Sequence, residues 1–218
     1  MGIPRRDGTL AADGLAFVIA DLFEGTTASW AGLSAESLID AVERQAGLAP
    51  SGQASWSGYM RAALGSEDGP RVDIASLGHE GAGFLHLIDR ATGSLEDVVL
   101  PETDAVHGDL EAGNILVTHP GDPNRPIGII DIDACGTGTR AVDYAWLVRD
   151  ATRHNAPEST TARLRRAGLD VAGSDVWAAC VTFACLELVG FVARSGKGAG
   201  VGEEIRALTP LLHEVSTT

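Results

Sequence analysis

Lysine is almost absent from this sequence. Lys197 is the single one, and 16 basic residues stand against 30 acidic ones, for a formal net charge of −14. A protein with this negative net charge repels the phosphates of nucleic acid, so nucleic acid is not expected as a partner. The same charge is compatible with a small cationic molecule. The charge balance therefore leaves small-molecule binding open and argues against binding to DNA or RNA.

Cysteine and long uncharged apolar runs are also scarce. The three cysteines, Cys135, Cys180 and Cys185, are too few and too irregularly spaced for a disulfide framework or a zinc site. They indicate small buried residues of a cytoplasmic protein. No basic segment with an apolar core opens the chain, so secretion is not expected. The most apolar window, Val176 to Ala193, contains Glu187 and predicts a buried core helix rather than a membrane span.

The most informative stretch runs from Ala105 to Asp133, AVHGDLEAGNILVTHPGDPNRPIGIIDID. It places Asp109 in a polar loop, Asn114 before one apolar run and Asp131 after a second. Turn-forming residues from His119 to Pro126 separate the two runs, which predicts a β-hairpin over Ile115–Ile130. A loop that feeds such a hairpin brings Asp109, Asn114 and Asp131 into one small space.

Phosphoryl transfer to an alcohol is the chemistry that uses these three side chains. One carboxylate accepts the proton of the attacking hydroxyl. An amide oxygen and a second carboxylate hold Mg²⁺ on the nucleotide phosphates. The stretch therefore predicts a kinase-type active site.

The order of these residues carries a family resemblance. H-x-D-x-x-x-x-N before a strand that ends in Asp is the kinase arrangement. With Gly108 at the second position and IDID at 130–133, the stretch resembles the aminoglycoside phosphotransferase and choline-kinase-like family. The segment from Gly136 to Leu147, GTGTRAVDYAWL, looks like that family's glycine-containing segment followed by D-x-A-x-L. The resemblance implies a protein-kinase-like fold, ATP and Mg²⁺ as cofactors, and a small hydroxylated acceptor such as an aminoglycoside-like antibiotic.

The resemblance also implies a role for each residue of the stretch. Asp109 is expected to act as the base, and Asn114 and Asp131 as metal ligands. His107 is expected to organise the site by bonding to the backbone near Asp131. Asp133 is left with three alternatives: a second Mg²⁺, the substrate, or a structural contact.

Two further acidic residues have more than one interpretation. Asp143 either caps the helix that follows it or braces the catalytic loop. Glu187 lies among apolar residues, where an unpaired carboxylate is costly. It is expected to point outward, to pair with an arginine such as Arg149, or to bind an ammonium group of the substrate.

The fold class predicted from these patterns is α+β, a mainly helical C-terminal lobe of a protein-kinase-like fold with short β-hairpins. Residues 1–25 are expected to be a remnant of the N-terminal lobe, with strands at Thr9–Ala12 and Leu15–Phe23. In the resemblance, the backbone of Asp21, Leu22 and Phe23 meets the adenine ring at the hinge. Residues 26–218 are expected to form the helical catalytic lobe.

About seven helices are predicted from apolar periodicity and end signals. Their ranges are Ser34–Gln45, Trp56–Leu64, Ala75–Thr92, Asp143–Thr152, Ser159–Ala167, Ser174–Arg194 and Glu203–His213. The glycines from Gly196 to Gly202 predict a flexible interhelical loop, because phosphate-binding glycine loops follow a strand. His79 and His86 have no third ligand at suitable spacing, so no metal site is expected there.

The family's glycine-rich strand pair and its phosphate-pairing lysine have no counterpart before Asp21. A fragment, a mis-called start and a naturally reduced protein all agree with this. It leads us to expect weak ATP binding by residues 1–218 alone and homodimerisation through the exposed hinge face. Three functions stay open: a small-molecule kinase, a catalytically incompetent kinase-like binding module, and a metal-dependent hydrolase, which the ordered motifs disfavour.

Overall fold

The computed structural model describes residues 6–12, 15–20, 25–49, 52–66, 68–93, 98–117, 126–195 and 198–216. The helices are α1 (Ala35–Glu43), α2 (Trp56–Gly65), α3 (Pro70–Ala75), α4 (His79–Thr92), α5 (Ala141–Arg153), α6 (Glu158–Arg194) and α7 (Gly198–Val215). The strands are β1 (Arg6–Ala12), β2 (Leu15–Ala20), β3 (Thr26–Thr27), β4 (Asp104–Val106), β5 (Ile115–Val117), β6 (Pro126–Ile129) and β7 (Gly136–Gly138). The predicted α+β class, dominated by helix, is confirmed.

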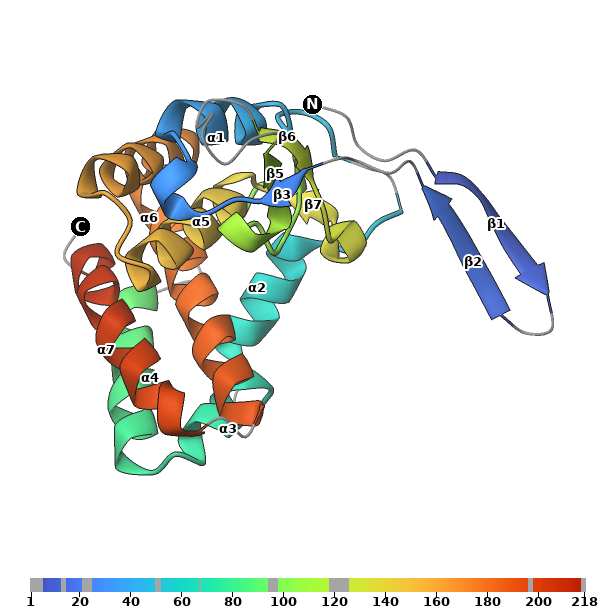
Figure 1. Cartoon of the computed structure of the whole chain (residues 1–218). Helices are drawn as coiled ribbons and strands as arrows, with labels where there is room; N and C mark the ends of the chain where they lie inside the picture. Colours follow the sequence, from blue (N-terminus) through green and yellow to red (C-terminus); the bar gives the residue numbers. More distant parts are fainter. Residues whose placement is uncertain are drawn as a thin grey trace.

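Within the described residues, the strands form three small antiparallel sheets. β1 pairs with β2, β3–β5–β6 form a three-stranded sheet, and β4 pairs with β7. Pairing of Ile115 with Ile129 confirms the hairpin expected in the central stretch. Figure 1 shows β3, β5, β6 and β7 gathered between α1 and α2, while the β1–β2 hairpin stands apart from the helices. Asp21, Leu22 and Phe23, the predicted hinge, lie outside the described residues.

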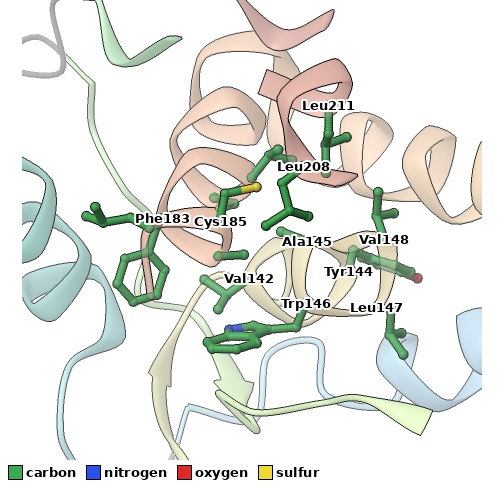
Figure 2. Close-up of a cluster of buried hydrophobic side chains, with 14 of the residues drawn as sticks. Val142, Tyr144, Ala145, Trp146, Leu147, Val148, Phe183, Cys185, Leu208 and Leu211 are labelled. Carbon is green, nitrogen blue, oxygen red and sulfur yellow. The ribbon is translucent and has the colours of Figure 1, made fainter. Parts of the chain in front are cut away.

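The core is built around α5, which is buried from Ala141 to Ala151. A helix buried on all sides needs apolar neighbours on every face, and α6 and α7 supply two of them. Figure 2 shows side chains of α5, α6 and α7 converging, among them Trp146, Phe183 and Leu208. Because α5 is enclosed, the polar side chains that it carries are held in fixed positions by the surrounding core.

Two of the predicted helices form where local signals placed them. Ser34 caps α1, since its Oγ accepts the N–H of Ser37 at 3.2 Å. Gly47, with φ +69°, lies just beyond the end of this helix. Ser55 caps α2 in the same way by accepting the N–H of Gly58 at 2.9 Å.

The helix predicted over Ala75–Thr92 is wrong at its start. The structure has α3 from Pro70 to Ala75 and a separate α4 from His79. Pro70 opens α3, because proline is favoured in the first turn of a helix. Gly78, with φ +70°, then interrupts the helical path between α3 and α4.

The helices predicted at Ser159–Ala167 and Ser174–Arg194 are both present as the two helical parts of α6. The break between them is confirmed at Gly173, whose φ of 70° and ψ of 172° are not helical. A third prediction near the C-terminus is wrong. The glycine-rich segment was predicted to be a loop, but Gly198 to Gly202 belong to the first turns of α7. A Cβ on Gly202 would lie 2.6 Å from Oε1 of Glu80, so this glycine allows α7 to approach α4 closely.

Helix α6 is also long and apolar enough, by length and composition, to cross a membrane. However, 61% of its most apolar window is buried inside the protein. Side chains of α6 such as Phe183 and Leu186 are fully buried in the core. This packing agrees with the predicted core helix.

Candidate active site

The predicted catalytic loop, residues 107–111, is held in place by Asp143, which lies in the first turn of α5. The Asp143 carboxylate accepts the backbone N–H groups of His107 at 2.8 Å and Gly108 at 2.9 Å. Asp143 is fully buried, and this burial raises the pKa of its carboxyl, while the two N–H groups favour the charged form. The residue that caps α5 is Arg140, so the capping interpretation of Asp143 is wrong and the loop contact is observed.

His107 connects the loop to the segment that carries Asp131. Its Nδ1 accepts the N–H of Asp109 at 3.2 Å, and its Nε2 lies 2.9 Å from the carbonyl oxygen of Ile130. An Nδ1 that accepts assigns the proton to Nε2, which then donates to Ile130. This neutral tautomer joins two backbone segments, which is the contact expected of an organising residue.

Asn114 makes the second connection. Its Nδ2 donates to the carbonyl oxygen of Asp109 at 2.8 Å and lies 3.4 Å from Oδ2 of the same residue. The carbonyl oxygen of Asn114 accepts the N–H of Ile130 at 3.0 Å. Asp109, Asn114 and the residue before Asp131 are therefore tied together by short hydrogen bonds.

Asp131 has an unusual backbone conformation. Its φ of 59° and ψ of 54° lie in the left-handed region, which residues other than glycine seldom adopt. The side chains of Asp131 and Asp133 are exposed, and neither makes a hydrogen bond or ion pair within the described residues. The turn presents these carboxylates to solvent beside the catalytic loop.

The residues present fit Mg²⁺ better than a transition metal. No cluster of three or more His, Cys, Asp or Glu side chains suited to a metal occurs in the part of the chain that the structure describes. Magnesium in nucleotide sites needs only one or two carboxylates, because phosphates and water supply the other ligands. Since Nδ2 of Asn114 points to Asp109, its amide oxygen remains for a cation together with Asp131.

Trp56 of α2 contacts both the loop that carries Asp109 and the segment that follows Asp131. A Cβ on Gly108 would overlap Cζ2 of the Trp56 ring, so only glycine fits at this position of the loop. The Nε1 of Trp56 donates to the carbonyl oxygen of Ala134 at 2.8 Å. The indole therefore contacts the catalytic loop with its ring and the segment after Asp131 with its N–H group.

Asp150 supports the short 3-10 helix Ala112–Asn114 from the core. Its Oδ2 accepts Nε1 of Trp30 at 2.8 Å and the backbone N–H of Ala112 at 3.1 Å, both in buried surroundings. Asp150 is 3% exposed and lies two turns beyond Asp143 on α5. The rigid helix α5 thus holds the loop at both its start and its end.

A cleft of about 700 Å³ opens beside Asp109, a volume within the usual range for small-molecule sites. Its apolar wall consists of Trp56, Tyr59, Trp146, Leu188, Phe191 and Val192. Its charged side chains are Asp109, Glu111, Arg149, Arg153, Glu187 and Glu204.

Glu187 lines this cleft, so its predicted outward orientation is wrong. It is half-buried, and its Oε1 accepts the hydroxyl of Tyr59 at 2.9 Å. Burial raises the pKa of the Glu187 carboxyl, and the Tyr59 hydroxyl offsets part of this effect. Burial and the charge of Glu187 together raise the pKa of Tyr59 to about 12, so that its hydroxyl remains a donor at neutral pH.

Both arginines of the cleft already have acidic partners. Arg149 lies 3.4 Å from Glu111, and its guanidinium stacks 3.8 Å from the ring centroid of Trp146. Arg153 pairs with Glu204 at 2.8 Å. Arg149 pairs with Glu111 and not with Glu187, so the arginine alternative for Glu187 is wrong as well.

Sequence reasoning missed Trp56, Tyr59, Glu111 and Asp150. Asp150 carried a signal that could have found it, since it is a second acidic residue seven positions after Asp143, which places both on the same face of the predicted helix. Trp56 and Tyr59 carried none, because their contacts with Ala134 and Glu187 span 78 and 128 positions.

Solved structures share this fold. An aminoglycoside phosphotransferase APH(4)-Ia, a thermostable mutant in its apo form, is 15% identical with a TM-score of 0.69 and covers 97% of this chain and 77% of its own. The GDP complex of a mutant aminoglycoside 2'-phosphotransferase-IIIa is 18% identical with a TM-score of 0.61, over 99% of this chain and 75% of its own. A choline/ethanolamine kinase family protein from Mesorhizobium loti is 15% identical with a TM-score of 0.50, over 99% and 79%.

No curated protein matches the sequence significantly. The model of the phosphotransferase enzyme family, however, matches residues 35–180, about two thirds of the chain. This range contains the catalytic loop, the β5–β6 hairpin and the whole of α5. The chain therefore belongs to the phosphotransferase enzyme family.

Proposed function

We propose that this protein transfers the terminal phosphoryl group of a nucleotide to a hydroxyl of a small cationic molecule. One observation carries the proposal: Asp109 lies in the wall of the cleft and is also hydrogen-bonded to Asn114. Asp109 is thus the residue at which a small-molecule site and a metal site meet. A kinase needs this junction, because the acceptor hydroxyl has to reach the phosphate that the metal holds.

In this proposal the Asp109 carboxylate orients the acceptor hydroxyl and takes its proton. The hydroxyl oxygen forms a bond to phosphorus while the bond from phosphorus to the nucleotide oxygen breaks. His107 does not carry the proton, because its Nδ1 accepts the N–H of Asp109 and its Nε2 faces Ile130. Its role, together with Asp143, is to keep the loop in place.

Asn114 and Asp131 are the proposed ligands of Mg²⁺, which neutralises charge on the phosphates when it is bound. Asp133 follows two residues later in the same exposed turn. Its side chain is available for a second Mg²⁺ or for the acceptor, so both alternatives remain for this residue.

The nucleotide is proposed to be ATP, with GTP as the alternative because one structural neighbour is a GDP complex. The acceptor class follows from the relatives and from charge. The neighbours are named for aminoglycosides, choline and ethanolamine, which are hydroxylated amines. A net charge of −14 and the acid-lined cleft favour such cations.

The test is a transfer assay with Mg·ATP and Mg·GTP and a panel of aminoglycosides and amino alcohols. Mass spectrometry detects an acceptor that has gained one phosphate, and a parallel assay measures free phosphate. A phosphorylated acceptor supports the proposal. Phosphate release without an acceptor product indicates the hydrolase alternative, and amine binding without either product indicates a binding module.

A further inference from the structure

We infer that the acceptor is an amphiphilic alcohol with a single ammonium group, separated from the reactive hydroxyl by an apolar stretch. The inference rests on the proposed function and narrows its substrate class. It comes from the charges and the exposed apolar side chains that line the cleft beside Asp109.

The charges of the cleft leave one carboxylate for a ligand cation. Glu111 and Glu204 are compensated by Arg149 and Arg153, at 3.4 Å and 2.8 Å. Asp109 is assigned to the acceptor hydroxyl. Among the acidic residues that line the cleft in the described chain, Glu187 is the remaining one without an ion pair. A polycationic ligand would need several such carboxylates, because each buried ammonium requires a partner.

A hydrogen bond from Tyr59 orients the Glu187 carboxylate for binding an ammonium group. The phenol donates to Oε1 at 2.9 Å, which fixes the carboxylate and leaves Oε2 for another donor. With a pKa of about 12, the phenol itself stays uncharged at neutral pH. The half-buried carboxylate would gain from an ammonium group, which restores the solvation that burial removes.

The wall around Glu187 is apolar and open to solvent. Phe191 follows one turn later on α6 and is 63% exposed, while Tyr59 is 47% exposed. Both side chains line the cleft together with Leu188 and Val192. Large apolar side chains grouped in a cleft mark a surface that a ligand covers. A polar sugar ring gains little from such a wall, whereas a hydrocarbon segment buries it favourably.

A chain of side-chain contacts along the wall links Asp109, where the acceptor hydroxyl is proposed to bind, to Glu187, where its ammonium group is proposed to bind. Gly108, next to Asp109, packs against Trp56. The rings of Trp56 and Tyr59 lie edge to face with centroids 5.6 Å apart, and Tyr59 bonds to Glu187. The hydroxyl at Asp109 and the ammonium at Glu187 therefore lie at opposite ends of this aromatic pair. Adjacent amine and hydroxyl groups, as in ethanolamine, do not span it.

The inference is tested by calorimetry with four probes: aminooctanol with its two groups at opposite chain ends, octanediol, ethanolamine and kanamycin. Aminooctanol is expected to bind at least tenfold more tightly than octanediol or ethanolamine. Glu187→Gln should remove this advantage by weakening aminooctanol binding about tenfold, and it should leave octanediol binding unchanged. Phe191→Ser should weaken aminooctanol and octanediol binding together, by several-fold.

Two control variants match these changes elsewhere on the surface. Glu36→Gln removes the same charge from an exposed ion pair with Arg163, and Val99→Ser removes an apolar side chain that is 82% exposed. Neither residue lines the cleft, so neither change should alter binding of any probe. Glu187 and Phe191 are partly or largely exposed, so both test variants are expected to fold, which thermal denaturation verifies.

The outcomes separate this inference from the proposed function. Kanamycin or ethanolamine binding more tightly than aminooctanol would overturn the inference even if phosphoryl transfer occurs. An aminooctanol affinity that is unchanged in Glu187→Gln would also overturn the inference. Glu187-dependent binding of aminooctanol with no phosphorylated product from any nucleotide would support the cleft assignment and contradict the proposed function.

Discussion

The indole ring of Trp56 fills the space that a side chain on Gly108 would need. A Cβ at Gly108 would overlap the ring, and the backbone there has φ +82°, a region that disfavours other residues. The same indole donates to the carbonyl oxygen of Ala134. The loop that carries Asp109 and the segment that follows Asp131 are thus packed on opposite parts of one side chain.

Gly108→Ala is expected to destabilise the protein by more than about 2 kcal/mol, because left-handed backbone strain and steric overlap act together. Activity should fall with it, since the loop has to move away from Trp56. Gly83→Ala is the matched control: Gly83 is exposed in α4, and nothing lies within 4 Å of an added Cβ. That change should stabilise by about 0.5–1 kcal/mol. Chemical denaturation measures both, and equal effects would contradict the packing argument.

Trp56→Phe separates the ring contact from the hydrogen bond. A phenyl ring keeps an aromatic surface beside Gly108 but cannot donate to Ala134 at 2.8 Å. Loss of this bond should cost about 0.5–1.5 kcal/mol. It should weaken Mg·nucleotide binding more than amine binding, because Ala134 ends the 3-10 turn that directly follows Asp131, a proposed metal ligand. A loss of amine binding with unchanged nucleotide affinity would show that Trp56 acts only as part of the cleft wall.

The sequence predicted the local parts of this site and missed the parts that depend on distant contacts. The order His107, Asp109, Asn114 and Asp131 lies within one loop and one hairpin, whose apolar runs and turn residues are readable in sequence. The wall of the cleft comes from α2 and α6, and nothing near Tyr59 indicates that it bonds to Glu187, 128 positions away. The same limit explains why Gly198 to Gly202 were expected in a loop. Their place in α7 depends on packing against α4, where Glu80 lies close to Gly202.

Asp150→Ala is expected to destabilise the protein and to loosen the 3-10 helix that carries Asn114. It would leave Nε1 of Trp30 and the N–H of Ala112 without their buried acceptor, at a cost of about 1–3 kcal/mol for each group. The 3-10 helix that ends at Asn114 would lose its support, so Mg·nucleotide affinity should fall. Asp170→Ala provides the control, because Asp170 is exposed and pairs with the exposed Arg166, and should change stability by less than about 0.5 kcal/mol.

Asp109→Ala and Asp131→Ala should have different kinetic effects. Removing the proposed base should lower the rate of phosphoryl transfer by about 10²–10⁴ and leave Mg·ATP binding nearly unchanged. Removing the proposed metal ligand should instead weaken Mg·ATP binding. Single-turnover kinetics and calorimetry measure the two quantities separately. If Asp109→Ala turned over acceptor like the parent protein, Asp109 would not be the base.

Ionisation of Glu187 as pH rises should lower the stability of the folded protein and increase its affinity for an amine. Burial raises the pKa of this carboxyl above its ordinary value of 4.5, although Tyr59, Arg149 and Arg194 favour the charged form. The folded protein therefore binds a proton at Glu187 more tightly than the unfolded chain does. Its contribution to stability is fully present below pH 4.5 and is lost as pH rises through the folded-state pKa.

Amine binding should follow the opposite course, because only the ionised carboxylate pairs with an ammonium group. Aminooctanol affinity is expected to fall as pH decreases through the raised pKa of Glu187, and Glu187→Gln should abolish this dependence. The same variant should gain stability relative to the parent as pH rises through that window, since it no longer buries a charge. Calorimetry and denaturation over one pH series measure both curves. Parallel changes in affinity for parent and variant would assign the titration to another acid in the cleft, such as Glu111, whose pKa burial also raises.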